Sequence, residues 1–271
     1  MPAAERLTEG QVGALLSRLG VSAGPPGLDT LSRVQRAWIF REPFHNIDLL
    51  AARARRSGSL SPEEAVSRCI DGLGGPCHVQ SVALLLLLRS LGFEAHLCGA
   101  TVSHRDDHLV VLVTVAGGRF FCDVGNGQPF LCPFPADRED RQSHLGWIVW
   151  SRPDGDDLVV ERASQDQPAR RVVYRASPAP RAWSDFERTI ARHHGEPGFG
   201  PFLTGLRVVR IGETEMVTLR DDVLTIYGEW GYERRTLASD EIASFVRDEL
   251  GLADLPVDEA VRTFLVATGR A

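Results

Sequence analysis

Apolar residues recur at helical spacing through the first ninety residues of the chain. In residues 12–19 the leucines follow Val12 at intervals of three, four and seven positions, which gives a helix one apolar face. The same spacing returns in residues 31–38 after a Gly-Pro-Pro-Gly break, and a third helix is expected to begin near Ser61 and Pro62. The pattern predicts a small helical cluster.

The most apolar helix is expected at residues 77–91. Pro76 suits the first helical position, and Gly92 is a typical stop signal. Residues 84–88 are five consecutive leucines, so no side of this helix can face water. This helix is therefore predicted to lie at the centre of the protein.

After residue 92 the apolar residues recur at every second position, the spacing typical of strands. Two turn signals, Gly117-Gly118 and Asp154-Gly155, lie between β-rich runs. Short sequential strands of this kind predict a small antiparallel barrel or a curled sheet. The expected strands are residues 93–102, 108–115, 119–124, 147–150, 158–160 and 171–174.

The last third follows a Pro-Ala-Pro break at residues 178–180. A helix is expected at residues 183–193, followed by a loop rich in Gly and Pro. Three strands and a final helix should complete this part of the chain. They are predicted at residues 206–211, 215–219, 223–227 and 240–250.

Composition and charge restrict the possible functions. The 271 residues carry 30 basic and 36 acidic side chains, a net charge of −6, which argues against a nucleic-acid-binding protein. The longest apolar run, residues 82–88, is far too short to cross a bilayer. Five cysteines at irregular spacing indicate free thiols rather than disulfides or a metal site, as expected for a cytoplasmic protein.

Cys77 is the strongest candidate for a reactive residue. It follows Gly74-Gly75-Pro76 at the expected start of a helix, where free backbone N–H groups and the helix dipole favour an anion such as a thiolate. For Cys69, Cys98, Cys122 and Cys132 we expect the ordinary role of a small buried hydrophobic residue.

A thiolate nucleophile usually needs an imidazole and a group that orients it. His108 opens a predicted strand, and Asp123 closes the next one, where an unpaired buried carboxylate would be costly. Direct pairing of these two residues needs a hairpin whose paired residue numbers sum to 231, whereas a Gly117-Gly118 turn gives 235. A bulge, strong twist or wider loop is needed to close this offset of about 13 Å.

Other motifs give little support to other chemistries. His104 and His108 are four residues apart, but in a loop before a strand rather than on a helix, so a metal site is not favoured. The chain has no glycine-rich phosphate loop and no Gly-x-Ser-x-Gly motif, so neither a nucleotide-binding loop nor a serine hydrolase is indicated.

The order Cys, His, Asp and several local stretches resemble the arylamine N-acetyltransferase family. Residues 42–48, Glu-Pro-Phe-His-Asn-Ile-Asp, are similar to its PFENLD segment, and residues 74–77 resemble the end of its RGGxC motif. Residues 123–127, Asp-Val-Gly-Asn-Gly, resemble DVGFG. The C-terminal third, with Asp185-Phe186 and the Pro/Phe loop at residues 197–202, also runs parallel to the family.

This resemblance implies an α+β fold with a papain-like Cys-His-Asp site. The expected parts are a helical bundle at residues 1–88 carrying the nucleophile, an antiparallel β-barrel at 89–182 carrying His and Asp, and an α/β lid at 183–271. It implies a ping-pong reaction without a bound cofactor, in which Cys77 takes an acyl group from acetyl-CoA or another thioester and passes it to a small amine. His108 would be the base and Asp123 would orient its ring. The implied substrate-binding residues are Phe44, Asn126, Gly127 and Phe202.

The chain departs from the family motifs at four positions. Leu73 and Val79 replace a charged pair around the nucleophile, a joint loss that can be neutral. His45 replaces the Glu of PFENLD, and Asn126 replaces the Phe of DVGFG. Since a buried amide needs hydrogen-bond partners, Asn126 favours an acceptor with polar groups near its amine, such as an amino-acid-like or amino-sugar-like compound.

Three alternatives stay open at this level. A relative of the same fold could be an amide synthase that takes a longer acyl chain from CoA or an acyl carrier protein. A transglutaminase-like cysteine peptidase or amidase shares the Cys, His, Asp order but does not explain residues 43–48. A binding protein on a degenerate scaffold is disfavoured, because all three triad positions are filled.

Overall fold

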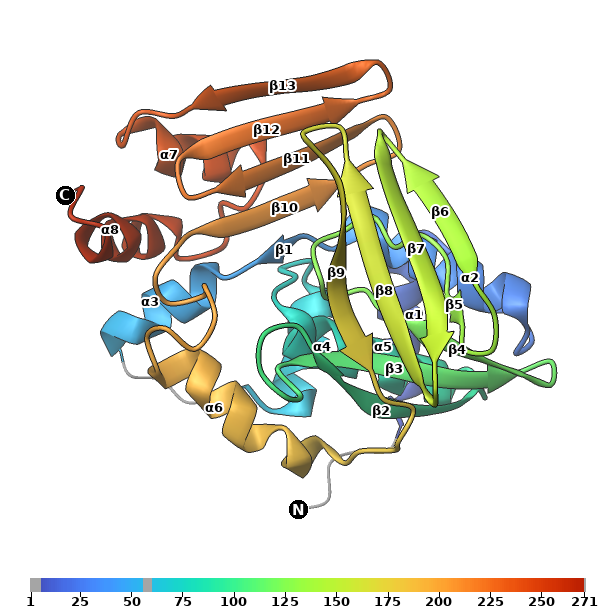
Figure 1. The fold of residues 1–271 in the computed structure, drawn as a ribbon. Helices are drawn as coiled ribbons and strands as arrows, with labels where there is room; N and C mark the ends of the chain where they lie inside the picture. Colours follow the sequence, from blue (N-terminus) through green and yellow to red (C-terminus); the bar gives the residue numbers. More distant parts are fainter. Residues whose placement is uncertain (1–5, 56–59, 271) are drawn as a thin grey trace.

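Helices form most of the N-terminal part of the computed structural model, which describes residues 6–55 and 60–270 (Figure 1). Thr8 and Ser61 cap the first and fourth helices through capping boxes with Gln11 and Glu64. The helical cluster expected from the spacing is present. Its members are α1 (Glu9–Leu19), α2 (Leu28–Arg41), α3 (Ile47–Arg55), α4 (Pro62–Ile70) and α5 (Cys77–Ser90).

Helix α5 lies in the middle of the molecule, as its leucine run predicts. Every residue from 77 to 88 is buried, and the helix packs on strands β2 (Glu94–Thr101) and β3 (His108–Val115). The helix starts at Cys77 as predicted, but Pro76 is its extended N-cap rather than its first helical residue, and it ends at Ser90. The thiol is therefore placed in the first turn of the central helix.

The central sheet is antiparallel throughout and strongly curled, which confirms the expected barrel. Within the described residues it has eight strands, in the order β5-β4-β3-β2-β9-β8-β7-β6. In Figure 1, β2 to β4 run across the base while β6 to β9 rise steeply from it. Phe121, Phe130 and Tyr174 belong to one buried apolar cluster contributed by these strands and the loop after β4. The other strands are β4 (Gly118–Cys122), β5 (Phe134–Pro135), β6 (Asp140–His144), β7 (Trp147–Asp154), β8 (Asp157–Ser164) and β9 (Gln167–Ala176).

Both predicted hairpin turns are displaced by one residue. The β3–β4 turn consists of Ala116 and Gly117, because Val115 pairs with Gly118. Both turn residues have positive φ, 52° and 76°, as a two-residue type I′ turn requires. The β7–β8 turn similarly lies at residues 155–156, since Asp154 pairs with Asp157.

A second antiparallel sheet dominates the C-terminal part, where the three predicted strands are present as β10, β11 and β12, joined by two strands that were not predicted. In the described chain it has five strands, in the order β1-β10-β11-β12-β13. Strand β13 (Gly231–Thr236) is almost wholly exposed and lacks apolar alternation, and β1 (Phe44–His45) comes from the N-terminal part. The remaining members are β10 (Arg207–Ile211), β11 (Glu215–Arg220) and β12 (Val223–Gly228).

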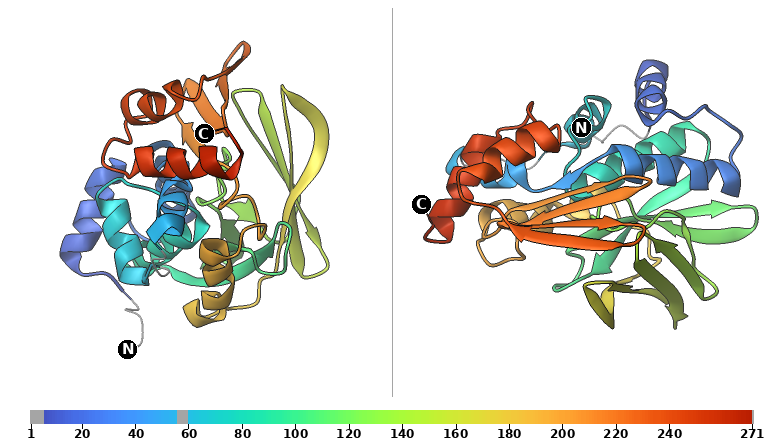
Figure 2. Two further views of the ribbon diagram at one scale, coloured as in Figure 1. Left: turned by 90° about the vertical axis from the view of Figure 1, so that its left-hand side faces the viewer. Right: turned by 90° about the horizontal axis from the view of Figure 1, so that it is seen from above.

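Helices cover one face of the C-terminal sheet (Figure 2). Helix α7 (Glu241–Ser244) continues into a π-helical turn (Phe245–Glu249), so the single helix expected at 240–250 is interrupted. It packs with α8 (Val257–Ala267) and α3 around one apolar core. The helix expected at 183–193 is a 3₁₀ turn (Trp183–Asp185) followed by α6 (Glu187–Gly195).

The division of the chain at residues 88 and 182 stays a prediction. Among the described residues, no helix is both long enough and apolar enough to cross a membrane.

Candidate active site

Cys77 is held at the start of α5 by a glycine turn that only glycine can form. Gly74 and Gly75 have positive φ, 61° and 140°, and a side chain at Gly74 would collide with the Pro43 carbonyl. Gly75 N donates to the Pro43 carbonyl (3.1 Å), and Gln80 Nε2 donates to the same oxygen (3.1 Å). These bonds tie the segment before the nucleophile to the segment that carries β1.

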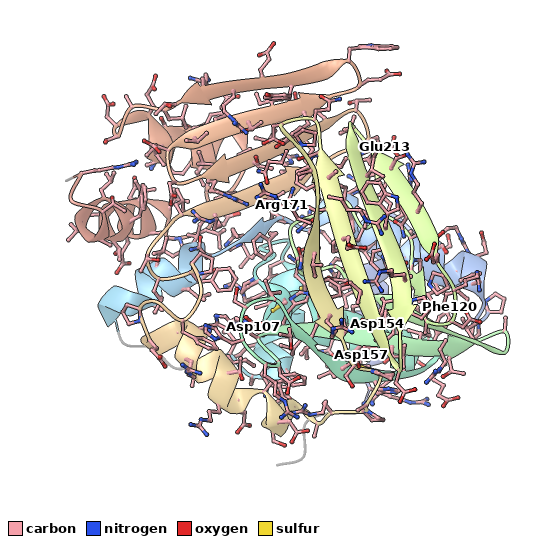
Figure 3. The ribbon with its side chains drawn as sticks, in the orientation of Figure 1. Asp107, Phe120, Asp154, Asp157, Arg171 and Glu213 are labelled. Carbon is pink, nitrogen blue, oxygen red and sulfur yellow. The ribbon has the colours of Figure 1, made fainter. Side chains whose placement is uncertain are left out.

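His108 begins β3 after a loop that Asp107 organises. The Asp107 carboxylate accepts hydrogen bonds from the backbone N–H groups of residues 102, 103 and 104 at 2.8–3.0 Å. Figure 3 labels Asp107 in this loop, close to α6, where its carbonyl lies 3.1 Å from His193 Nε2. The backbone on which His108 sits is therefore fixed from both sides.

The structure brings His108 and Asp123 together. His108 Nε2 lies 2.9 Å from Asp123 Oδ2, and both side chains are buried. In the β3–β4 hairpin the numbers of paired residues sum to 233, as in Val111 opposite Cys122. This sum lies midway between 231, which direct pairing of His108 and Asp123 needs, and 235, which a Gly117-Gly118 turn would give. Asp123 is thus a diagonal neighbour of His108 across the hairpin, and such neighbours lie within reach of longer side chains.

The imidazole also interacts electrostatically with Cys77, so Asp123 and Cys77 both act on the His108 ring. Burial by itself lowers the pKa of His108, but the Asp123 carboxylate and the Cys77 sulfur raise this pKa well above its usual value. Since Nε2 faces Asp123, Nδ1 is the ring nitrogen left for the thiol. This arrangement favours a positively charged imidazole beside Cys77.

Gly125 brings the end of the Asp123 segment directly against Cys77. Its backbone N–H donates to Asp123 Oδ1 (3.1 Å). A methyl group at Gly125 would collide with the Cys77 backbone, including its nitrogen at 3.2 Å. The absence of a side chain at this position therefore permits the contact between the two segments.

Three of the four expected substrate-binding residues line one cavity. Phe44, Asn126 and Gly127 border a space of about 450 Å³ between the central and C-terminal sheets. Asn126 Nδ2 lies 3.5 Å from His108 Nε2, so this residue connects the cavity to the triad. Phe202 is not in the lining of this cavity, although its ring centroid lies 6.2 Å from that of Phe44.

Two of the motif departures contact each other. His45, which is fully buried, donates through Nε2 to the Leu73 carbonyl (2.6 Å), while its Nδ1 accepts from Ile47 N (3.2 Å). Burial lowers the pKa of His45, which agrees with a neutral ring in this role. A neutral hydrogen bond therefore occupies the surroundings in which the family motifs have charged side chains.

Asn46 is a structural position beside the site that the sequence pattern does not single out. Its Nδ2 donates to the carbonyls of Phe202 (2.7 Å) and Gly205 (2.6 Å), and its Oδ1 accepts from Arg207 N (2.7 Å). These bonds hold the Pro/Phe loop and the start of β10 against β1. The only signal was its place within the motif-like residues 42–48.

Glu42 is a buried acid next to the glycine turn. Burial raises its pKa from 4.5 to about 7 even though Arg18 Nε lies 3.1 Å from Oε1. Its Oε2 is buried and has no hydrogen-bond partner, so the lost hydration of the charged form is only partly compensated. The carboxyl group is therefore held close to its neutral form.

We expect Glu42 to make the protein less stable as the pH rises. The unfolded state loses this proton near pH 4.5 and the folded state near pH 7, so the free energy of unfolding falls across that interval, by on the order of 3 kcal/mol. Urea unfolding of wild type and Glu42→Gln at a series of pH values measures this. The difference between the two proteins should change across pH 5–7, and two parallel profiles would contradict the assignment.

Among the described residues, no cluster of His, Cys, Asp and Glu side chains could hold a metal ion. His104 stacks on Phe199 with ring centroids 4.6 Å apart, whereas His108 faces Asp123. The two histidines singled out by spacing thus have separate partners.

A family model described as N-acetyltransferase matches residues 27–258. The chain belongs to this family. Its members transfer an acetyl group to the nitrogen of an amine, so the protein is an enzyme of the N-acetyltransferase class, and the expected resemblance is confirmed. The match lends no support to an amide synthase or a cysteine peptidase.

Solved structures of arylamine N-acetyltransferases share the fold. The enzyme from Mycobacterium abscessus is 21% identical with a TM-score of 0.82, and the alignment covers 95% of each chain. The enzyme from Salmonella typhimurium is 18% identical with a TM-score of 0.82, covering 96% of this chain and 100% of its own. The Mycobacterium marinum enzyme in complex with CoA is 21% identical with a TM-score of 0.81, covering 93% and 98%. No curated protein matches the chain.

Proposed function

We propose that the protein transfers an acetyl group from acetyl-CoA to a small amine through a thioester on Cys77. The observation that carries this proposal is the set of contacts Cys77–His108–Asp123, buried together within the fold of an N-acetyltransferase. Cys77 is the nucleophile, His108 the base and acid, and Asp123 orients the imidazole.

In the first half-reaction the Cys77 thiolate attacks the thioester carbonyl of the donor. The tetrahedral oxyanion lies near the backbone N–H of Cys77, which as the first residue of a helix has no intrahelical acceptor. When the intermediate collapses, the bond to the CoA sulfur breaks, and the imidazolium of His108 gives that sulfur its proton. Acetylated Cys77 and free CoA result.

In the second half-reaction the amine attacks the carbonyl of acetylated Cys77. Neutral His108 accepts the proton that the amine loses, and the Cys77 thiolate leaves. The amide is released, and the thiolate and imidazolium are restored. Asp123 holds the ring in place throughout.

The donor and the location follow from related observations. A structural relative is known in complex with CoA, which supports a CoA thioester as the donor; nothing supports a carrier protein. All five cysteines are free, and four are buried, which fits a reducing compartment such as the cytoplasm.

Mass spectrometry of the intact protein tests the proposed function. After exposure to a panel of acyl-CoA thioesters, the protein should gain the mass of one acyl group, and peptide mapping should find it on Cys77. An acyl group on Cys69 or Cys122 instead would contradict the proposal. Both of these thiols are fully buried, and burial raises the pKa of each.

Asn126 should select acceptors that carry polar groups near the amine. Its Oδ1 accepts from Gln128 Nε2 (2.8 Å), and its Nδ2 faces the triad, where an unsubstituted aniline ring supplies no acceptor. When both amines are present, we expect the acetylated enzyme to transfer its acetyl group to polar amines at least about tenfold faster than to unsubstituted aniline. Asn126→Phe should reverse that preference. If aniline is the best acceptor of both proteins, Asn126 does not select the acceptor.

A further inference from the structure

The cavity between the two sheets has a positively charged wall. Among the described residues, five arginines and three aspartates line it, together with the apolar side chains of Phe44, Trp147, Val209 and Leu219. They come from the upright strands of the central sheet, from β10 to β13 and from the C-terminal end of the chain (Figure 1). The charges therefore converge from segments that are distant in sequence.

Three of these arginines are neutralised by the three aspartates. Each forms an ion pair with one carboxylate of the lining. The pairs are Arg207 with Asp221 (2.7 Å), Arg270 with Asp222 (2.6 Å) and Arg234 with Asp166. No carboxylate of the lining is left to balance the other two arginines, Arg162 and Arg220.

Arg162 and Arg220 have no carboxylate in ion-pair contact within the described part of the chain. Arg162 lies over the Trp147 ring, 4.7 Å from its centroid, and donates to Gln167 Oε1 (3.3 Å). Arg220 stands directly opposite Arg207 across β10 and β11. Like charges at such positions destabilise a sheet, so an anion in the cavity would relieve the repulsion.

The electrostatics of Arg162 agree with this geometry. Partial burial and the charge of Arg220 lower the pKa of Arg162. The whole chain has a net charge of −6, so a local excess of two positive charges is not a general property of its surface. Guanidinium groups bind oxyanions through charge-assisted hydrogen bonds, and do so best where solvent is partly excluded.

We propose that Arg162 and Arg220 form an anion subsite that holds the carboxylate or sulfonate of the acceptor amine. This inference rests on the proposed function and names its substrate class: small amines with an acidic group remote from the nitrogen. Asn126 lies at the border between this cavity and His108, so an acceptor anchored at the arginines can direct its amine toward Cys77.

The charge balance favours the acceptor over the donor as the source of the anion. CoA carries three phosphate groups, with more negative charge than two uncompensated guanidinium groups can balance, whereas two guanidinium groups can share one carboxylate or sulfonate through charge-assisted hydrogen bonds. The apolar side chains of Phe44 and Trp147 offer contact area for the body of such an acceptor.

The test compares 3-aminobenzoate with 3-aminobenzamide, which have nearly the same shape and differ in charge. The enzyme is first acetylated with p-nitrophenyl acetate, a donor without phosphates, and the rate of transfer to each amine is measured. Wild type should prefer the benzoate. In Arg220→Gln the KM for the benzoate should rise by about tenfold to a hundredfold, with little change for the benzamide.

Two further variants separate charge from structure. Arg220→Lys keeps the positive charge and should retain most of the preference for the benzoate. Arg235→Gln removes an exposed arginine of the same sheet that does not line the cavity, and should leave both acceptors unaffected. An equal loss for benzoate and benzamide in Arg220→Gln would mean a structural role and would overturn the subsite.

Calorimetric titration of the unacetylated protein with 3-aminobenzoate distinguishes failure of the subsite from failure of the proposed function. Binding that weakens at least tenfold in Arg220→Gln supports the subsite even if Cys77 is never acetylated. Normal acetylation of Cys77 with no preference for the benzoate overturns the subsite alone. A variant that is slowly acetylated by acetyl-CoA, but normally by p-nitrophenyl acetate, assigns the arginines to the donor phosphates and overturns the acceptor assignment.

Discussion

Cys77→Ser is expected to lose acetyl transfer by at least about a thousandfold, because a serine hydroxyl in this position is a far weaker nucleophile than a thiolate. The substitution changes little else: the side chain is buried in the first turn of α5 and its neighbours contact the backbone around it. Steady-state rates with acetyl-CoA and an amine measure the loss, and intact mass should show no acetylated protein.

Cys132→Ser is the matched control for the nucleophile. Cys132 is the exposed cysteine and is therefore the thiol most open to non-specific acylation. This variant should acetylate and turn over like wild type. Full activity in Cys77→Ser, or loss of labelling in Cys132→Ser, would refute the assignment of the nucleophile.

Removing either His108 or Asp123 should slow alkylation of Cys77 at neutral pH by at least about tenfold. The raised pKa of His108 keeps its ring positively charged well above pH 6.5, so the thiolate has a cationic partner at pH 7. A thiol without such a partner ionises near pH 8.5 and is only a few per cent thiolate at pH 7. Iodoacetamide rates against pH for wild type, His108→Ala and Asp123→Asn measure the effect.

The sign of the pH shift is specific. In both variants the pH at which alkylation reaches half its maximal rate should move upward. His108→Ala removes the imidazolium, and Asp123→Asn removes the carboxylate partner of the imidazolium. His104→Ala, whose ring stacks on Phe199 outside the triad, should behave like wild type. Three profiles with the same midpoint would mean that His108 and Asp123 do not act on the thiol.

The helix that carries the nucleophile could be predicted because its signals are local. Five consecutive leucines and flanking Gly and Pro residues specify α5 and its ends without reference to the rest of the chain. The same holds for β10 to β12, whose apolar positions alternate. In contrast, β13 is exposed on nearly every residue, so it carries no such pattern and is defined by its pairing with β12.

The meeting of His108 and Asp123 could be predicted only as a possibility. A hairpin register depends on the turn, and two adjacent glycines at 117 and 118 suggest the wrong turn by one residue. Ala116 adopts a positive φ that alanine seldom takes, and this strain is accepted because the rest of the sheet fixes the strands. The unpaired arginines gave no sequence signal at all, since they come from different strands.

The bonds of Asn46 bear on the order in which the protein acquires activity during synthesis. The residue joins β1 to a loop and a strand that follow it by about 160 positions, with sequence separations of 156, 159 and 161. On a ribosome the nucleophile's helix emerges early, yet Phe44 can acquire its partner Val209 only after most of the polypeptide has been translated. A nascent chain arrested before residue 207 would therefore carry Cys77 without a finished substrate cavity, so activity should appear only once the C-terminal sheet has formed.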